Sequence, residues 1–158
     1  VAAMIAFIVD VHTLGLQSGQ GLTFTESSYW DLNDRTRALT ARIRPKMPNN
    51  FWPNSVTFQC YSVVLHYLKA CAAIGPAQAK ASGLAAIEAM KRLPTDDDAF
   101  GAGSVRADGR KLHPTYLLQA KAPGESRGPW DYLKLVATTP AEEAFRPLAD
   151  GNCAFLRT

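Results

Sequence analysis

Hydrophobic and polar positions along this chain follow strand spacing first, then helix spacing, then strand spacing again. The apolar run MIAFIV at residues 4–9 has no polar break and predicts a buried strand. The next stretch, DVHTLG, predicts a single helical turn that ends at Gly15. Residues 21–27 (GLTFTES) place Leu22 and Phe24 on alternate positions, which predicts a second strand.

Three helices are predicted in the middle of the chain. The first follows YWDLND, is capped by Asn33 or Asp34, and ends before Pro45. The third covers residues 79–92 and ends before Pro94. Its apolar positions share one face, which comprises Leu84, Ile87, Met90 and Leu93.

The second helix is the clearest element of the pattern. Asn54 or Ser55 caps its start, and Gly75 follows its end. Apolar residues cover most of its circumference, so we expect it to be deeply buried and packed on more than one side. These residues are Val56, Phe58, Cys60, Tyr61, Val63, Val64, Leu65, Tyr67, Leu68 and Cys71.

The last third returns to strand patterns. TDDD and GAGS, at residues 95–98 and 101–104, are expected to be flexible connections. A weak strand near residues 104–106 precedes the turn sequence ADGR, which is typical of a hairpin. The segments TYLLQAK and WDYLKLVATT then complete a predicted β-meander.

Composition restricts the class of protein. The 158 residues are 47% apolar and 20% charged, which indicates a globular domain. No apolar run approaches the roughly 18 residues of a membrane span. The net charge of +3 is too small to indicate nucleic-acid binding, and the basic residues at 35–46 predict a solvated helix face. The chain begins inside an apolar segment without an initiator Met, so we expect a mature or truncated fragment.

Catalytic, metal and cofactor motifs are not found in the sequence: it contains no phosphate-binding loop, zinc-protease motif or nucleophile elbow. Cys60 and Cys71 lie roughly 16 Å apart along one predicted helix, so they cannot bond to each other. Either could pair with Cys153, although buried free thiols are the preferred interpretation. The acidic pairs in TDDD and at residues 142–143 are expected to be solvated.

Aromatic and amide side chains at the ends of elements are the candidate ligand-binding residues. Tyr29 and Trp30 follow a strand and precede a helix, and Gln59 and Tyr61 lie near the start of the second helix. Such positions line crevices in α/β folds. The alternative is that these aromatic residues simply belong to a core.

Four blocks of the sequence together resemble a known family. They are DVHTLGLQSGQGLTFTESSYWDLND, FQCYSVVLHYLKA, VRADGRKLHPTYLLQAK and SRGPWDYLKLVATTPAEEAF. Their order resembles the C-terminal part of type I periplasmic solute-binding proteins, in the branched-chain amino-acid (Leu/Ile/Val) branch of ABC-importer receptors. The resemblance implies an α/β fold of two lobes, to which this chain contributes helices for one lobe and strands for the other.

The resemblance also implies an organisation of the chain. Residues 1–25 correspond to the end of lobe two and a hinge, and 26–95 to the helical segment of lobe one. Residues 96–138 correspond to the closing meander of lobe two, and 139–158 to a C-terminal tail. Members of the family run to more than twice this length, so a complementary fragment or a second copy of the chain is expected to complete the cleft.

The function implied is that of a periplasmic binding protein without enzymatic activity. It would capture a small carboxylate, such as an amino acid or an aromatic acid, by hinge closure and deliver it to a membrane permease. No cofactor, metal or nucleic acid is expected. Two alternatives remain open: a cytosolic small-molecule sensor of the same fold, and a Cys/His hydrolase.

Overall fold

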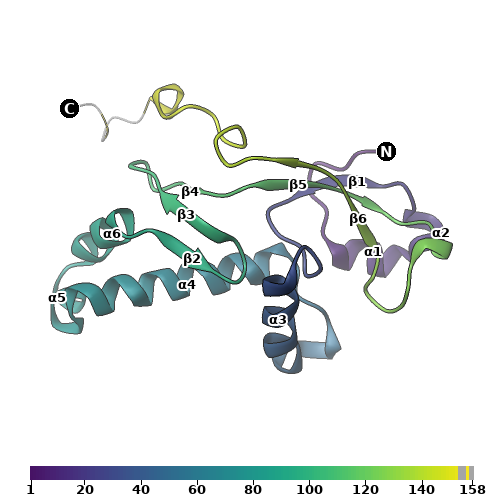
Figure 1. Ribbon diagram of the computed structural model, residues 1–158, viewed down its shortest axis with the longest axis horizontal. Helices are drawn as coiled ribbons and strands as arrows, with labels where there is room; N and C mark the ends of the chain where they lie inside the picture. The colour runs from purple at the N-terminus through teal and green to yellow at the C-terminus, as the bar shows by residue number, and fades with distance from the viewer. Residues whose placement is uncertain (153–155, 157–158) are drawn as a thin grey trace.

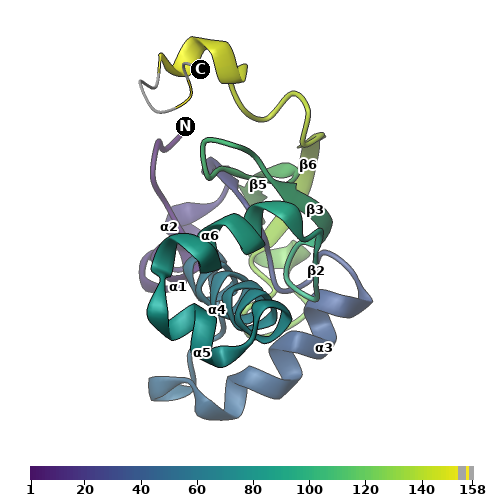
Figure 2. The same cartoon turned by 90° about the vertical axis from the view of Figure 1, so that its left-hand side faces the viewer.

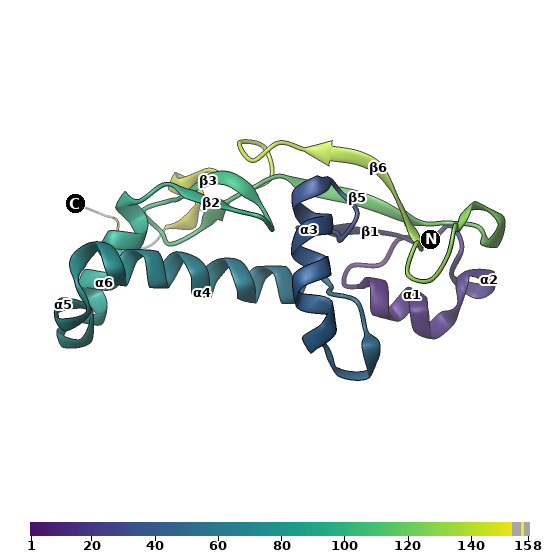
Figure 3. The same cartoon turned by 60° about the horizontal axis from the view of Figure 1, so that its bottom comes forward.

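The computed structural model describes residues 1–152 and Leu156, and the molecule is elongated, with two bodies side by side (Figures 1 and 3). The body that we call the sheet body contains α1 (Ile8–Leu14), α2 (Leu16–Gly19), β1 (Thr23–Glu26), β5 (Thr115–Ala120) and β6 (Leu133–Thr139). The helical body contains α3 (Asp34–Ile43), α4 (Ser55–Ile74), α5 (Pro76–Ala81), α6 (Gly83–Arg92), β2 (Thr95–Asp97), β3 (Gly101–Val105) and β4 (Lys111–Leu112). Short 3-10 turns occupy Arg44–Lys46, Pro48–Asn50, Pro123–Glu125 and Leu148–Gly151.

The sheet body is built on three antiparallel strands in the order β1-β5-β6. Phe24 on β1 pairs with Leu118 on β5, and both side chains are buried beside α1 in one apolar cluster. A register shift between Leu117 and Leu118 leaves Val136 of β6 as an extra residue, which is a β-bulge. The strands predicted from GLTFTES, TYLLQAK and WDYLKLVATT are therefore confirmed.

The strand predicted at residues 4–9 is wrong. Only Ala2 bridges to β1, in parallel with Thr23, and the helix α1 begins at Ile8. The backbone N–H of Phe7 donates to the Asp10 carboxylate at 2.7 Å, which closes the first turn of α1. Ile8 and Val11 then face the core at helical spacing, so the apolar run is divided between an extended arm and a helix.

The helical body has its own sheet, in the order β2-β3-β4. The meander predicted over residues 96–138 is thus divided between the two bodies, and TDDD and GAGS form strands rather than flexible connections. Gly103 is required where β3 passes its neighbours, because a Cβ there would lie 2.8 Å from the Leu112 carbonyl oxygen. The predicted hairpin turn is confirmed, with Gly109 at a φ of 86° between β3 and β4.

Helices α3 and α4 begin where their caps predict. The Asn33 side chain accepts from the Thr36 N–H at 3.0 Å, and Asn54 accepts from the Thr57 N–H at 3.1 Å. The expectation that α4 is buried on several sides is wrong for the described residues. Figure 2 views α4 along its axis, with α5 and α6 in front and β2 and β3 to one side. The face that packs there carries Ser55, Phe58, Ser62, His66 and Ala70.

The opposite face of α4 is apolar and exposed. Its residues are Val56, Val64, Tyr67 and Leu68. We call this set the open face of α4. A large exposed apolar patch marks a surface that contacts another segment, another molecule or a ligand.

The helix predicted at residues 79–92 is two helices, because Ser82 caps α6 by accepting from the Ala85 N–H at 3.3 Å. Its predicted apolar face is also wrong: Leu84 is 71% exposed, whereas Ala86 and Ala89 are buried. These small side chains allow α6 to lie close to α4. Among the described residues, no helix combines the length and apolar character needed to cross a membrane.

Candidate functional site

Among the described residues, two crossings lead from one body to the other before β5, and the segment after β6 returns to the hairpin, where the Arg106 guanidinium donates to the Arg146 carbonyl at 2.9 Å (Figure 1). Residues 27–33 lead from β1 to α3, and His113–Pro114 lead from β4 to β5. The first crossing is tied to the helical body, since the Ser28 hydroxyl donates to the Ala99 carbonyl at 3.0 Å. The Gln59 amide of α4 also donates to the Ser27 hydroxyl at 2.8 Å.

An aromatic group surrounds the first crossing. Tyr29 is buried in the core of the sheet body, and its hydroxyl lies 3.4 Å from the Trp130 carbonyl oxygen. The indole N–H of Trp30 donates to the same oxygen at 2.9 Å. Trp30 also meets Trp52 edge-on at 4.3 Å and packs against the apolar clusters of both bodies. This group therefore fixes the crossing relative to the loop before β6.

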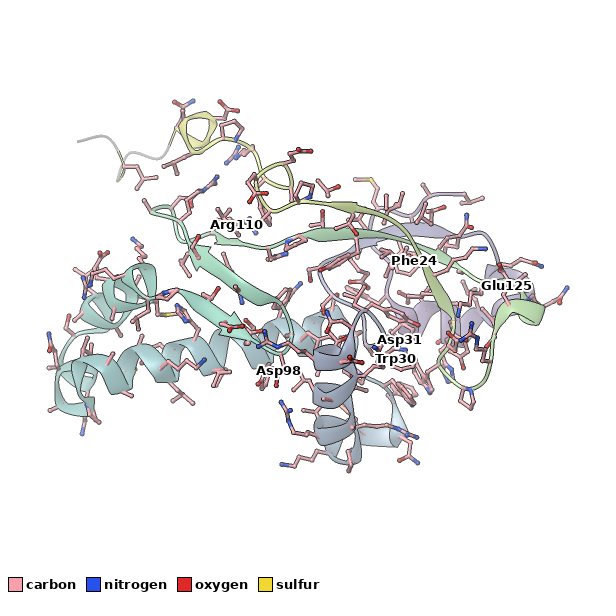
Figure 4. All side chains as sticks on the ribbon, viewed as in Figure 1. Phe24, Trp30, Asp31, Asp98, Arg110 and Glu125 are labelled. Carbon is pink, nitrogen blue, oxygen red and sulfur yellow. The ribbon has the colours of Figure 1, made fainter. Side chains whose placement is uncertain are left out.

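A cavity of about 630 Å³ lies beside this aromatic group, and we call it the junction cavity. Figure 4 shows Trp30 and Asp31 at its position between the bodies. Its charged residues are largely paired: Asp31 binds Arg37 at 2.7 Å, and Lys121 binds Asp131. The cavity is lined by Trp30, Asp31, Arg44, Trp52, Lys121, Arg127, Gly128, Pro129 and Asp131.

A second cavity, of about 460 Å³, lies between α4, α6 and the hairpin of β3 and β4. We call it the hairpin cavity. Lys111 at its wall donates to the Asp97 carboxylate at 2.8 Å and to the Ser62 hydroxyl at 2.6 Å. Ser62 in turn donates to Asp97 at 2.6 Å. Burial would raise the pKa of Asp97, but the hydrogen bonds from Lys111 and Ser62 outweigh it and lower that pKa.

The network around Asp97 corrects the expectation that all of TDDD is solvated. Asp97 is 6% exposed, and the backbone N–H groups of Ala99 and Phe100 also donate to it. Asp96 and Asp98 do face solvent, where they pair with Arg35 and Arg42 of α3. Arg35 and Arg42, on the helix face that was expected to be only solvated, therefore form ion pairs.

Glu26 at the end of β1 is a functional candidate that the sequence analysis missed. It is 6% exposed, and burial raises its pKa from 4.5 to about 7; a hydrogen bond with Ser55 opposes the rise, and the charge of Asp10 adds to it. The signal was available, because Glu26 is two residues from Phe24 and so lies on the apolar face of β1. A buried carboxyl thus lies where the chain leaves the sheet body.

The four predicted ligand residues fall into two groups. Tyr29 and Trp30 meet at Trp130, and Trp30 lines the junction cavity. Gln59 lines the hairpin cavity, whereas Tyr61 packs against the core of the helical body. The structure does not bring all four into one cavity, and their role in binding stays a prediction.

The cysteines and histidines are dispersed. Cys60 is exposed and Cys71 half-buried, so the preference for buried thiols is wrong for Cys60, and Cys153 lies outside the described residues. His66 is buried and its Nε2 donates to the Met90 carbonyl at 2.9 Å. Within residues 1–152 and Leu156, no three His, Cys, Asp or Glu residues are placed to hold a metal ion.

Comparison with known proteins identifies the family. The model of the periplasmic binding protein family matches residues 1–127. A periplasmic binding protein from Burkholderia mallei is 39% identical over 99% of this chain, with a TM-score of 0.86. A branched-chain amino-acid ABC transporter periplasmic ligand-binding protein from Burkholderia xenovorans is 36% identical over 97% of the chain, with a TM-score of 0.85.

A more distant structure agrees in fold. The leucine-, isoleucine-, valine-, threonine- and alanine-binding protein from Brucella ovis, in its closed conformation, is 14% identical over 88% of the chain and 36% of its own length, with a TM-score of 0.71. No curated protein sequence matches the chain. The chain spans 40% of the Burkholderia mallei structure and 39% of the Burkholderia xenovorans structure. The resemblance found in the four sequence blocks is confirmed, and the chain belongs to the periplasmic binding protein family, with the type I α/β fold.

Proposed function

We propose that this chain is part of the substrate-binding component of an ABC importer. It captures a small carboxylate solute, a branched-chain or other amino acid or an aromatic acid, in the periplasm and delivers it to a membrane permease. The observation that carries the proposal is the 39% identity to a periplasmic binding protein over 99% of the chain. The name of the Burkholderia xenovorans relative supports an amino-acid ligand.

Capture works by closure of two lobes about the crossings. We assign residues 1–26 and 115–139 to one lobe, and residues 34–112 to the other. This assignment moves residues 96–112 from the lobe expected from the sequence, because β2 and β3 pack against α4 and α6. The short crossing His113–Pro114 and the return segment after β6, which contacts the hairpin through the Arg146 carbonyl and Phe145, are the parts that suit a hinge.

The junction cavity supports a ligand site at the crossing. Trp30 and Trp52 provide aromatic surface, and Arg44 and Arg127 provide cationic groups for a carboxylate. Within this proposal, Tyr29 holds Trp30 in place, and Gln59 and Tyr61 approach the ligand from α4 on closure.

The open face of α4 supports a partner within the same protein. Its exposed aliphatic residues have the character of a core, and the chain spans about 40% of its relatives. We propose that the remainder of the longer protein covers this face. A second copy of this chain is the competing occupant.

Thermal unfolding of the full-length protein that contains this chain tests the function. Leucine, valine or benzoate at 100 times its dissociation constant should stabilise the native state by about 2.7 kcal/mol, which raises Tm by a few degrees. Trp30→Ala should reduce this shift, while Leu14→Ala, at an exposed position on α1 outside both cavities, should leave it unchanged. If no small carboxylate raises Tm, the transport function is wrong.

A further inference from the structure

We propose that the hairpin cavity is a second binding site, for a small organic acid that has an apolar body. Its lining comes from residues 59–113, and it is distinct from the junction cavity where the solute site is proposed. The inference does not depend on the transport function, because it rests on the cavity, on a guanidinium without a carboxylate partner among the described residues, and on two imidazoles in the lining.

The cavity has the size and the wall of a ligand site. Its volume of about 460 Å³ lies within the roughly 300–1,000 Å³ of small-molecule pockets. One part of the lining is apolar and comprises Val63, Met90, Phe100 and Val105. Such a wall favours the hydrocarbon part of a ligand.

Arg110 supplies the charge that selects an acid. Of the three formally charged residues that line the cavity, Asp108 is paired with Arg106 at 2.6 Å and Lys111 with Asp97 at 2.8 Å. Among the described residues, the Arg110 guanidinium has no carboxylate partner and lies over the Phe145 ring at 5.2 Å. Figure 4 shows Arg110 on the hairpin between β3 and β4, and this residue lines the cavity. An unpaired guanidinium binds a carboxylate with two parallel hydrogen bonds.

Two imidazoles in the lining provide hydrogen-bond acceptors. The Nδ1–H of His113 donates to the Pro114 carbonyl at 2.8 Å, and the Nε2–H of His66 donates to the Met90 carbonyl at 2.9 Å. In a neutral imidazole whose N–H donates in this way, the other ring nitrogen is an acceptor. Burial is the main reason that the pKa of His113 is lowered, and Lys111 and Arg110 add to that effect. The site therefore suits an acid that also carries a hydroxyl or another N–H or O–H donor.

Calorimetric titration of the full-length protein tests the site, with sodium mandelate, an aromatic 2-hydroxy acid, as the probe. We expect mandelate to bind, and its neutral amide, mandelamide, to bind at least tenfold more weakly. Arg110→Gln should weaken mandelate binding at least tenfold. Arg127→Gln, the matched substitution in the junction cavity, should change it less than twofold.

The outcomes separate this inference from the transport function. Loss of mandelate binding in Arg110→Gln with leucine binding intact supports a second site. Loss in Arg127→Gln or Trp30→Ala, but not in Arg110→Gln, places the acid at the junction and overturns the inference. The inference is also wrong if the wild-type protein does not bind mandelate. A melting curve for each variant shows whether it is folded. Arg110→Lys keeps the charge and should lose only part of the affinity for mandelate, which distinguishes a lost charge from misfolding.

Discussion

The sheet body and the helical body are held together by different interactions. In the sheet body, a large apolar cluster joins α1, β1, β5 and the loop before β6, and includes Phe24, Leu118 and Trp130. In the helical body, the buried apolar cluster contains only Leu39, Phe58 and Ala99, with a few partly buried neighbours. Polar contacts also hold the helical body together. They are centred on Asp97 and on the ion pairs between α3 and the β2–β3 turn.

This difference shows which surface of the helical body stays unpacked within this chain. The helical body has abundant apolar residues, but those on the open face of α4 contact solvent, and its packed face is partly polar. Burial of apolar surface is the main favourable contribution to folding, so the open face of α4 adds little to the stability of this chain by itself. The sheet body buries Phe24, Tyr29 and Trp130 within the chain. It also has exposed apolar residues on its N-terminal arm and on β6, namely Met4, Ile5, Leu135 and Val136.

The largest expected effect tests the polar contribution to the helical body. Asp97→Asn removes the charge that pairs with Lys111 and should lower the free energy of unfolding by about 2–4 kcal/mol, as measured by urea denaturation of the full-length protein. Asp96→Asn, at a neighbouring exposed position, should cost less than about 1 kcal/mol. Equal costs for the two substitutions would show that the buried network is not what stabilises this body.

The next effect tests Glu26, where the sheet body meets the first crossing. Because its pKa is raised from 4.5 to about 7, the native state binds the proton more tightly than the unfolded state. Its favourable contribution is complete below pH 4.5 and is lost as the pH rises through about 7. Glu26→Gln should therefore stabilise the protein by roughly 2–3 kcal/mol at pH 8 and very little at pH 4.5.

Urea denaturation at both pH values measures this difference. Glu142→Gln, at an exposed position, is the control and should leave the pH dependence unchanged. A Glu26→Gln variant with the wild-type pH dependence would contradict the buried, protonated carboxyl.

The smallest effect tests the open face of α4. Val64 is 56% exposed in this chain, so Val64→Ala would cost little if the face stays in solvent. If the remainder of the protein covers it, the same substitution should cost about 1–2 kcal/mol in the full-length protein, since two methyl groups leave a core. Lys80→Ala on α5 is the control, with an expected cost below about 0.5 kcal/mol. If Val64→Ala and Lys80→Ala lower the free energy of unfolding equally, the open face of α4 is not covered in the full-length protein.

Local signals predicted the element boundaries well. The starts of α3 and α4 follow from Asn33 and Asn54, because a side-chain oxygen next to free N–H groups acts within one turn. The Asp-Gly turn follows from equally local geometry, whereas β2, β4 and most of β3 were not predicted. The N-terminal prediction failed because an unbroken apolar run suits a strand and a buried helix alike.

The candidate site was predicted only in part. Trp30 does lie at the junction, as a residue between a strand and a helix should. The partners that fix it, Trp52 and Trp130, come from segments distant in sequence, and no local pattern connects them. Glu26 could have been found from its position on the apolar face of β1, whereas the contact of Asp97 with Lys111 could not.

The sequence by itself determined the family, the caps, the hairpin turn and the strands β1, β5 and β6, because these depend on residues close together or on blocks in a recognisable order. The tertiary structure decided which face of each helix is buried and how the last strands divide between the bodies. It also decided which carboxyl groups are desolvated, namely those of Glu26 and Asp97. Those outcomes depend on packing between distant segments, since a side chain is desolvated only by what comes to lie against it. For the open face of α4, the described part of the chain contains no such segment.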